Sequence, residues 1–388
     1  MKMKNILILS PDSPVNSMGG LGVHLREVLN RVDTSLYNVY AVCQGTQNMI
    51  LQDGKVKIFG LYEEKRSFEE DAYVNTFINQ SKFISLVNTL INNEEIQVPD
   101  VVHIMDWTTA IAGEELAKQF NAKIVFSVHL SINNYINKIH PLQEINHRFA
   151  TDLEFNVCRK ADKIIHVTKH YSTLFPFNVF EWKTDVVHNG VDYKSFSNAK
   201  TDYSFPGNNK IKAVYIGRLA SMKNVETLYK VAGITKNIDF IFIGGEEGSD
   251  KHLLQQLSSL SKEEDNNIYY LGAKYGQEKI NIMSSADLII MPSIHEPFGL
   301  VALEALSAGQ NGKTIFLSSF VDGMGEFLTD DASIKCGITV ISIKRAINKF
   351  LLMSDEEKEN MRLKGCELAQ KYTWDICTNK IQEVWQEI

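Results

Sequence analysis

Short apolar runs alternate with amphipathic stretches along the chain. In the first half, the runs that predict strands are Ile6–Leu9, Val39–Cys43, Val56–Phe59, Val101–Ile104, Lys123–Val128 and Lys163–Val167. Stretches with helical periodicity, such as Gly22–Arg31 and Phe68–Asn92, lie between these runs. Strands that alternate with helices favour a parallel sheet covered on both faces, which is an α/β architecture.

The same rhythm restarts in the second half of the chain. The predicted strands there are Ala213–Ile216, Phe240–Ile243, Ile268–Leu271, Leu288–Met291 and Ile315–Ser318. The stretch from Tyr193 to Asn209 is rich in Ser, Asn, Lys and Gly and has the composition of a linker. A chain of 388 residues is also too long for one ordinary core. We therefore predict two Rossmann-like domains, 1–190 and 191–374, followed by a helical stretch at 375–388.

Composition narrows the class of protein. Apolar residues make up 44% of the chain and charged residues 22%, as in soluble globular proteins, and the net charge is −7. This balance gives no sign of nucleic-acid or anionic-membrane binding. The first apolar run is too short for a signal peptide, and no run approaches the ~18 apolar residues of a membrane helix. The cysteines show no CxxC spacing, so we expect a cytoplasmic protein with reduced thiols and no stable membrane insertion.

The segment after the predicted strand Leu288–Met291 carries two carboxylates, Glu296 in a turn and Glu304 on the helix that follows. A strand, a loop and a helix N-terminus form the place where open α/β sheets bind anions and nucleotides. The amides that the helix itself leaves unpaired there are those of Phe298, Gly299 and Leu300. The carboxylates suit the hydroxyls of a sugar or ribose. The alternative is an ordinary capped helix with two solvated glutamates.

A second strand-to-helix turn carries cations. Gly217 and Arg218 directly follow the strand Ala213–Ile216, and Lys223 lies five residues after Arg218. An arginine fork and a lysine ammonium at such a turn can converge on a diphosphate. The alternative is a solvated basic loop.

Three further segments follow predicted strands. Gly19 and Gly20 open a helix after the first strand, where paired glycines let the backbone approach a ligand or simply pack closely. His129 follows the strand Lys123–Val128. Asp106 and Trp107 follow Val101–Ile104, and Asp106 can equally cap the next helix.

Together these segments resemble the retaining GT-B glycosyltransferases of group 1 (family 4). Glu296 and Glu304 match the Glu-x7-Glu motif of that family, and Gly217-Arg218-Leu219 with Lys223 matches its Gly-Arg-Leu-x4-Lys motif. The resemblance implies a GT-B fold, in which the parallel sheets of two Rossmann-like domains face a central cleft. It implies an N-terminal domain that binds the acceptor and a C-terminal domain that binds the donor. The last helix of such proteins commonly crosses back onto the first domain, whereas periodicity alone equally allows an ordinary helix of the second.

The resemblance also implies a reaction: transfer of a sugar, commonly a hexose, from a nucleoside-diphosphate sugar to a saccharide or other hydroxyl acceptor, as in polysaccharide biosynthesis. It implies no cofactor and no metal. The implied leaving-group contacts are Arg218, Lys223, Gly19, Gly20, Gly217 and the amides of Phe298, Gly299 and Leu300. For the transferred sugar, the resemblance implies contacts from His129 and Glu296. For the ribose it implies Glu304, and for the base it implies Gly272 and Ala273. The His-Asp-Trp pattern of glycogen and starch synthases implies an acceptor role for Asp106 and Trp107.

Two departures and several rival functions remain. Ser17 stands where glycogen and starch synthases carry a lysine, and the segment 310–326 lacks the family's usual pattern. A sugar-nucleotide epimerase and a catalytically silent nucleotide-sugar binder are the alternatives, while a dehydrogenase is disfavoured because no GxGxxG occurs. The sequence leaves the donor, the acceptor and the oligomeric state open.

Overall fold

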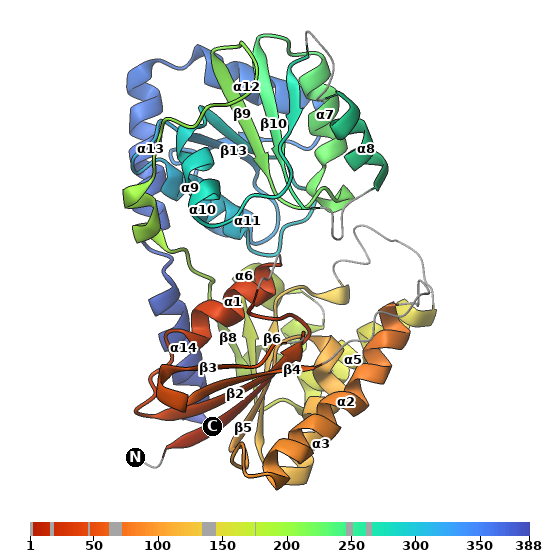
Figure 1. Ribbon diagram of the computed structural model, residues 1–388. Coiled ribbons are helices and arrows are strands. Elements are labelled where there is room, and N and C mark those ends of the chain that lie inside the picture. The colour runs from red at the N-terminus through yellow and green to blue at the C-terminus, as the bar shows by residue number, and fades with distance from the viewer. Residues whose placement is uncertain are drawn as a thin grey trace. The chain divides into compact units, whose positions relative to one another are not determined.

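The computed structural model describes residues 3–15, 19–45, 47–61, 72–133, 145–174, 176–245, 251–260 and 266–388. Ser17 and the start of the predicted helix Phe68–Asn92 lie outside these ranges. The chain forms two compact units, each of which is an α/β layer structure (Figure 1). Unit 1 comprises Met1–Asn189 with Trp374–Ile388, and unit 2 comprises Gly190–Thr373.

Unit 1 is built on an eight-stranded sheet of order β3-β4-β2-β1-β5-β6-β7-β8. Its strands are β1 (Lys4–Ser10), β2 (Tyr37–Gln44), β3 (Met49–Leu51), β4 (Val56–Leu61), β5 (Val101–Ile104), β6 (Lys123–Val128), β7 (Lys163–His166) and β8 (Thr184–Val186). All neighbours pair in parallel except β3 and β4, which are antiparallel. The predicted strands are confirmed. The short strands β3 and β8 at the sheet edges were not predicted.

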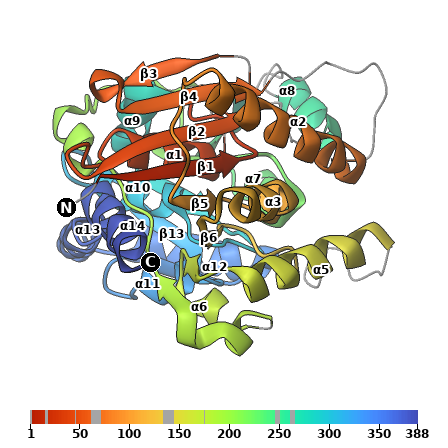
Figure 2. The ribbon, with the colours of Figure 1, turned by 90° about the horizontal axis from the view of Figure 1, so that it is seen from below.

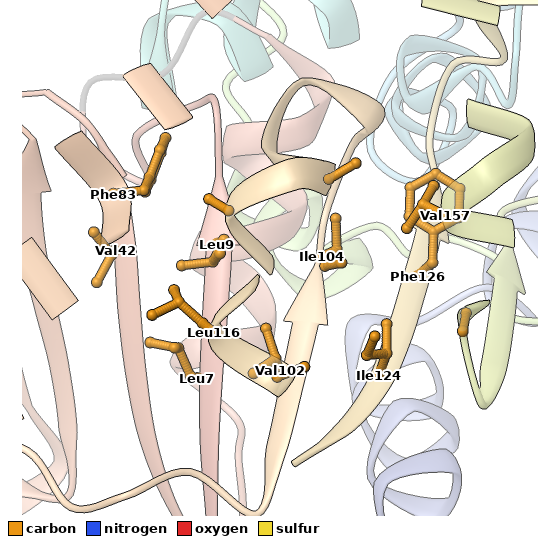
Figure 3. Close-up of a cluster of buried hydrophobic side chains, with 14 of the residues drawn as sticks. Leu7, Leu9, Val42, Phe83, Val102, Ile104, Leu116, Ile124, Phe126 and Val157 are labelled. Carbon is orange, nitrogen blue, oxygen red and sulfur yellow. The ribbon is translucent and has the colours of Figure 1, made fainter. Parts of the chain in front are cut away.

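Helices cover the sheet of unit 1. They are α1 (Gly20–Leu29), α2 (Ala72–Asn92), α3 (Ala110–Phe120), α5 (Ile145–Lys160), α6 (Lys169–Ser172) and α14 (Trp374–Glu387), with the 3-10 turns η1 (Gln52–Gly54), η2 (Trp107–Thr109) and η3 (Phe177–Lys183). Helices α2, α3 and α5 follow one another across one face (Figure 2). Their buried side chains Phe83, Leu116 and Val157 join strand residues such as Leu9 and Phe126 in one apolar cluster (Figure 3).

The last helix, α14, packs on unit 1 beside α1. Trp385 is fully buried, and its Nε1 donates a hydrogen bond to His103 Nδ1 on β5 at 3.1 Å. The Tyr37 hydroxyl of β2 donates to the Gln382 carbonyl at 3.0 Å. Periodicity left two places open for this helix, and these long-range contacts place it on the first sheet.

Unit 2 contains a six-stranded, fully parallel sheet of order β11-β10-β9-β12-β13-β14. Its strands are β9 (Ile211–Ile216), β10 (Ile238–Ile243), β11 (Ile268–Tyr270), β12 (Leu288–Met291), β13 (Ile315–Ser319) and β14 (Ile334–Cys336). Its helices are α7 (Val225–Gly233), α8 (Lys251–Leu260), α9 (Gly276–Ser285), α10 (Leu300–Ala308), α11 (Met324–Phe327), α12 (Val340–Leu352) and α13 (Asp355–Ala369). Strand β14 was not predicted. The strand order reverses between β9 and β12, which is the switch point where such sheets bind ligands.

The prediction that Tyr193–Asn209 is a linker is wrong. The segment begins with the 3-10 helix η4 (Tyr193–Asn198) and belongs to unit 2. The amide of Tyr203 donates to Ser285 Oγ at 3.1 Å, and the amide of Asn209 donates to Asp239 Oδ2 at 2.9 Å. This segment therefore forms hydrogen bonds with the rest of unit 2. Composition alone cannot distinguish a polar segment bonded in this way from one exposed to solvent.

No helix in the described part of the chain is both long and apolar enough to cross a bilayer.

The packing of α14 predicts a local loss of stability. We expect Trp385→Ala to destabilise unit 1 by about 3–5 kcal/mol, because it leaves a cavity and removes the partner of His103. Trp182→Ala is the matched control: Trp182 is 80% exposed, so its change should cost less than about 1 kcal/mol. Hydrogen–deuterium exchange in urea measures both, and equal protection of unit 1 in the two variants would contradict the packing.

The buried ring of His166 predicts an acid-dependent loss of stability. Neither ring nitrogen has a hydrogen-bond partner within the described ranges, and burial lowers the pKa of His166 from 6.5 to about 3. The unfolded chain therefore takes up a proton below pH 6.5 that the folded chain refuses. His166→Leu removes this penalty, so its stability relative to the wild type should rise by about 2 kcal/mol between pH 7.5 and 5. Urea unfolding at both pH values tests this, and a difference that is constant with pH contradicts it.

Candidate functional site

The carboxyl ends of β9 and β12 bring two predicted loops together. The loop after β9 holds Gly217–Asn224, and the loop after β12 holds Pro292–Gly299. The amides of Ile294 and His295 both donate to the Met222 carbonyl, at 2.9 and 3.2 Å. The main chains of the two loops are therefore joined directly at the switch point.

Lys223 and Glu296 form an ion pair across these loops. Lys223 Nζ lies 2.5 Å from Glu296 Oε2, and the two side chains are only 14% and 9% exposed. The structure thus joins two residues that the sequence singled out separately. Burial, followed by the Glu296 charge, raises the pKa of the neighbouring Tyr215, whose hydroxyl donates to the Arg218 carbonyl at 2.6 Å. A neutral phenol therefore holds the main chain of this loop.

The Arg218 side chain differs from that of Lys223. It is exposed, and it makes no hydrogen bond or ion pair with the other residues that the structure describes. Arg218 therefore presents an uncompensated positive charge within a loop whose second cation is already paired. The guanidinium group of Arg218 is therefore available to bind a ligand anion through two parallel hydrogen bonds.

Glycines let the ends of β9, β10 and β11 pack main chain to main chain. The Gly217 amide donates to the Ile243 carbonyl at 3.0 Å, and the Gly244 amide donates to the Gly272 carbonyl at 3.1 Å. A Cβ on Gly244 would lie 2.3 Å from the Gly217 oxygen. Gly272 has open space beside its Cα but φ of +70°, so its main-chain conformation favours glycine. Ala273 follows it at this edge.

The predicted helix start is confirmed at Leu300, the first residue of α10. Gly299 caps the helix with φ of +98°, and a Cβ there would meet Met324 at 3.2 Å. Phe298 is buried, with its ring 5.3 Å from that of Phe327. First-turn amides of a helix have no acceptor within it and carry the positive end of the dipole, so this edge suits an anion.

Glu304 lies within α10 and is paired with another cation. Its Oε2 is 2.6 Å from Lys279 Nζ of the adjacent helix α9 (Figure 1). The side chains are 27% and 23% exposed, so both remain within reach of a ligand. The two motif glutamates therefore have separate lysine partners.

Sequence analysis missed Asp322, in the loop after β13. Its Oδ2 accepts hydrogen bonds from the Glu296 amide at 2.9 Å and from His295 Nδ1 at 2.6 Å. The only sequence signal was that the segment 310–326 departs from the family pattern, which does not point to Asp322 in particular.

The carboxyl edge of the unit 1 sheet brings His129 next to His24. Their ring centroids are 4.5 Å apart. Burial, and then the nearby His24 and His103, hold the pKa of His129 well below its usual range. Its Nε2 has no hydrogen-bond partner among the described residues. The structure therefore provides a neutral imidazole with an unengaged nitrogen.

His24 of α1 is also neutral. Its Nδ1 pairs with Asn189 Oδ1 at 2.7 Å, while burial lowers its pKa to about 4. Gly19 and Gly20 lie at the start of the same helix. A Cβ on Gly19 would come within 2.7 Å of Asp12 Oδ2, so a side chain at that position would displace this carboxylate.

Asp106 caps the turn that follows β5. Its Oδ1 accepts from the amide of Thr108 at 3.0 Å and from its hydroxyl at 2.9 Å, and burial raises the pKa of Asp106 to about 6. The capping alternative is thus realised, and the acceptor role of Asp106 stays a prediction. Trp107 packs against Ile132, next to the buried Glu154, which sequence analysis did not find.

Comparisons with known proteins agree with this geometry. Residues 18–195 match the family described as Glycosyltransferase Family 4, and residues 199–366 match Glycosyl transferases group 1. A D-inositol 3-phosphate glycosyltransferase of Mycolicibacterium smegmatis is 26% identical over 245 residues, which cover 60% of this chain and 55% of that protein. The chain thus spans little more than half the length of this curated relative.

Two solved structures share the fold. Sucrose-phosphate synthase of Thermosynechococcus elongatus superposes with a TM-score of 0.82 at 17% identity, covering 99% of this chain and 98% of that one. An Anabaena protein in complex with UDP and glucose gives a TM-score of 0.72 at 17% identity, covering 99% and 100%. The two family matches, which together run through both units, and these neighbours show that the chain belongs to the group 1 GT-B glycosyltransferases.

Proposed function

We propose that this protein transfers a sugar from a nucleoside-diphosphate sugar to a hydroxyl of a saccharide or other acceptor, with retention of the anomeric configuration. The observation that carries the proposal is the cluster at the β9–β12 switch point. There, Lys223 pairs with Glu296 beside the N-terminus of α10, and Arg218 lies in the same loop as Lys223.

Two cations are positioned for the leaving group. As the bond from the sugar to the diphosphate breaks, negative charge grows on the phosphate oxygens, and fixed positive charges stabilise that change. Arg218 is free to contact the diphosphate directly. Lys223 supplies a second charge that its pairing with Glu296 holds in place. The first-turn amides of α10 add a third source of positive potential. These groups neutralise the diphosphate without a metal ion.

The two glutamates serve different parts of the donor. Glu296 lies in the loop beside the cations, where its carboxylate can accept hydrogen bonds from the hydroxyls of the transferred sugar. Glu304 lies farther along α10, next to Lys279, where it can accept from ribose hydroxyls. The turn at Gly272 and Ala273 presents main-chain groups to the base.

On unit 1, His129 contributes a neutral ring that can exchange hydrogen bonds with a sugar hydroxyl. Gly19 and Gly20 offer the first amides of α1 to an anion. We propose that the departing phosphate accepts the acceptor's proton, so that the reaction needs no carboxylate of the protein as a nucleophile. Asp106 and Trp107 are the proposed acceptor contacts.

The similar proteins support this chemistry without fixing its substrates. The Anabaena structure contains UDP and glucose, and the other two are named for sugar-phosphate or inositol-phosphate chemistry. We therefore propose a hexosyl donor. A thermal-shift panel of UDP, GDP, ADP and their sugars identifies the base, since the bound nucleotide raises the melting temperature by mass action. Product formation only with an added acceptor separates transfer from epimerisation, and binding without turnover indicates a silent binder.

The exposed guanidinium gives a clean test of charge stabilisation. We expect Arg218→Ala to lower kcat/KM. The loss should correspond to about 2–4 kcal/mol of transition-state stabilisation, because the charge of Arg218 engages only the donor. The melting temperature should not change, since the side chain has no partner within the described residues. Lys230→Ala, an exposed cation on α7, is the control. Activity of Arg218→Ala equal to that of the control contradicts the assignment, as does a strict loss of wild-type activity in EDTA.

Steady-state kinetics separate the two glutamates. Glu304→Gln should raise the donor KM more than it lowers kcat, because ribose contacts do not change during the reaction. Glu296→Gln should lower kcat more than it raises KM, since this carboxylate lies beside the reacting sugar. Glu278→Gln removes an exposed carboxylate of α9 that pairs with Lys274, and it should change neither constant. Wild-type constants in both motif variants, checked for folding by melting, would remove the main support for the proposal.

A further inference from the structure

The loop after β13 places a buried carboxylate behind Glu296. Asp322 has a side chain only 2% exposed. Its Oδ2 accepts two hydrogen bonds from the neighbouring loop, from the Glu296 amide at 2.9 Å and from His295 Nδ1 at 2.6 Å. Ser319 adds a third link between these loops, with its hydroxyl donating to the Ser293 carbonyl at 2.5 Å. The Glu296 loop is thus anchored to the end of the next strand.

Asp322 stands at a position whose backbone conformation favours glycine. Asp322 has φ of +47°, in the left-handed region that favours glycine. A glycine would adopt this conformation with less strain and would leave the buried space without a charge. What aspartate adds here is the acceptor for Glu296 and His295, since a buried carboxylate is tolerated when its oxygens are hydrogen-bonded.

Glu296 is therefore held at both ends. Asp322 fixes its main-chain amide, and Lys223 fixes its carboxylate at 2.5 Å. The Met222 carbonyl holds the two preceding amides. The side chain between the two anchors is left with little freedom, so the direction in which it faces the donor depends on both. Removing Lys223 would also remove a charge from the diphosphate site, whereas Asp322 is not one of the residues assigned to the donor, and removing it takes away the acceptor of the Glu296 amide and of His295.

We infer that Asp322 is a positioning residue for the transfer reaction: its carboxylate holds the Glu296 main chain so that the Glu296 carboxylate stays aligned with Lys223 and with the donor sugar. This inference rests on the proposed function of Glu296. It assigns no contact between Asp322 and the substrate.

The first test is Asp322→Gly, which removes the carboxylate while suiting the backbone. We expect kcat to fall at least tenfold, the donor KM to change less than threefold, and the melting temperature to stay within a few degrees of the wild-type value. The matched control is Asp53→Gly, because Asp53 is exposed and has φ of +55° in unit 1. It should retain wild-type kinetics. Asp322→Asn keeps an oxygen acceptor for the Glu296 amide and should restore part of kcat. A wild-type kcat in Asp322→Gly overturns the inference.

A double variant shows whether Asp322 acts through Glu296. If it does, adding Asp322→Gly to Glu296→Gln causes no further loss of kcat beyond that of Glu296→Gln alone. Losses that multiply overturn the positioning role, because they show that Asp322 affects the reaction by another route.

A measurement without turnover separates this inference from the proposed function. Hydrogen–deuterium exchange of the Glu296 amide should speed up at least tenfold in Asp322→Gly and stay at the wild-type rate in Asp53→Gly. Unchanged exchange in Asp322→Gly overturns the anchor itself. Faster exchange in a protein that transfers no sugar from any nucleotide donor leaves the anchor standing and refutes the proposed function on which the positioning role rests.

Discussion

The pairing of β9 with β12 is the constraint on which the candidate donor site depends. Leu288 and Ile289 of β12 pair in parallel with Ala213 and Val214 of β9. Parallel neighbours end at the same edge of a sheet, so the loops that follow them must meet. That meeting joins Lys223 to Glu296 and lets the Met222 carbonyl accept from the opposite loop. Each of these contacts depends on β9 and β12 being neighbours in the sheet.

Charged side chains then link the elements at this edge of unit 2. Glu296, Glu304 and Asp322 each accept hydrogen bonds from a named partner: Lys223, Lys279, and the His295 ring with the Glu296 amide. A charge taken out of water is costly unless such a partner meets it, so the buried carboxylates of Glu296 and Asp322 tolerate only a narrow geometry. Arg218, the exception, is exposed. The edge of unit 2 thus combines a rigid charged frame with one cation available to a ligand.

In unit 1, by contrast, the side chains at the sheet edge include buried histidine rings that stay neutral. Burial lowers the pKa values of His24, His103 and His129, and the nearby His24 further lowers those of His103 and His129. The outcome is a cluster of neutral imidazole rings that can donate or accept hydrogen bonds. Such an edge suits hydroxyl groups, whose hydrogen bonds need direction more than charge. The Trp385 indole, which donates to His103, ties this cluster to the C-terminal helix.

The sequence alone determined the class of fold and the identity of the motif residues. Apolar runs located the longer strands because a strand buried in a parallel sheet must be apolar along its length. The spacing of Glu296 and Glu304 and the residues around Arg218 indicated the family, because these loops follow strands of that sheet.

Only the tertiary structure decided which residues are partners. Strands β3, β8 and β14 span three residues each and form through pairing with a neighbour, so their own sequence carries little signal. The composition of Tyr193–Asn209 predicted a linker, because a polar segment has the same composition whether its residues bond to water or to a domain. Lys223 and Glu296 are 73 positions apart, and Asp322 and Glu296 are 26 apart. Such contacts depend on how strands are ordered in space, which local composition and periodicity do not encode.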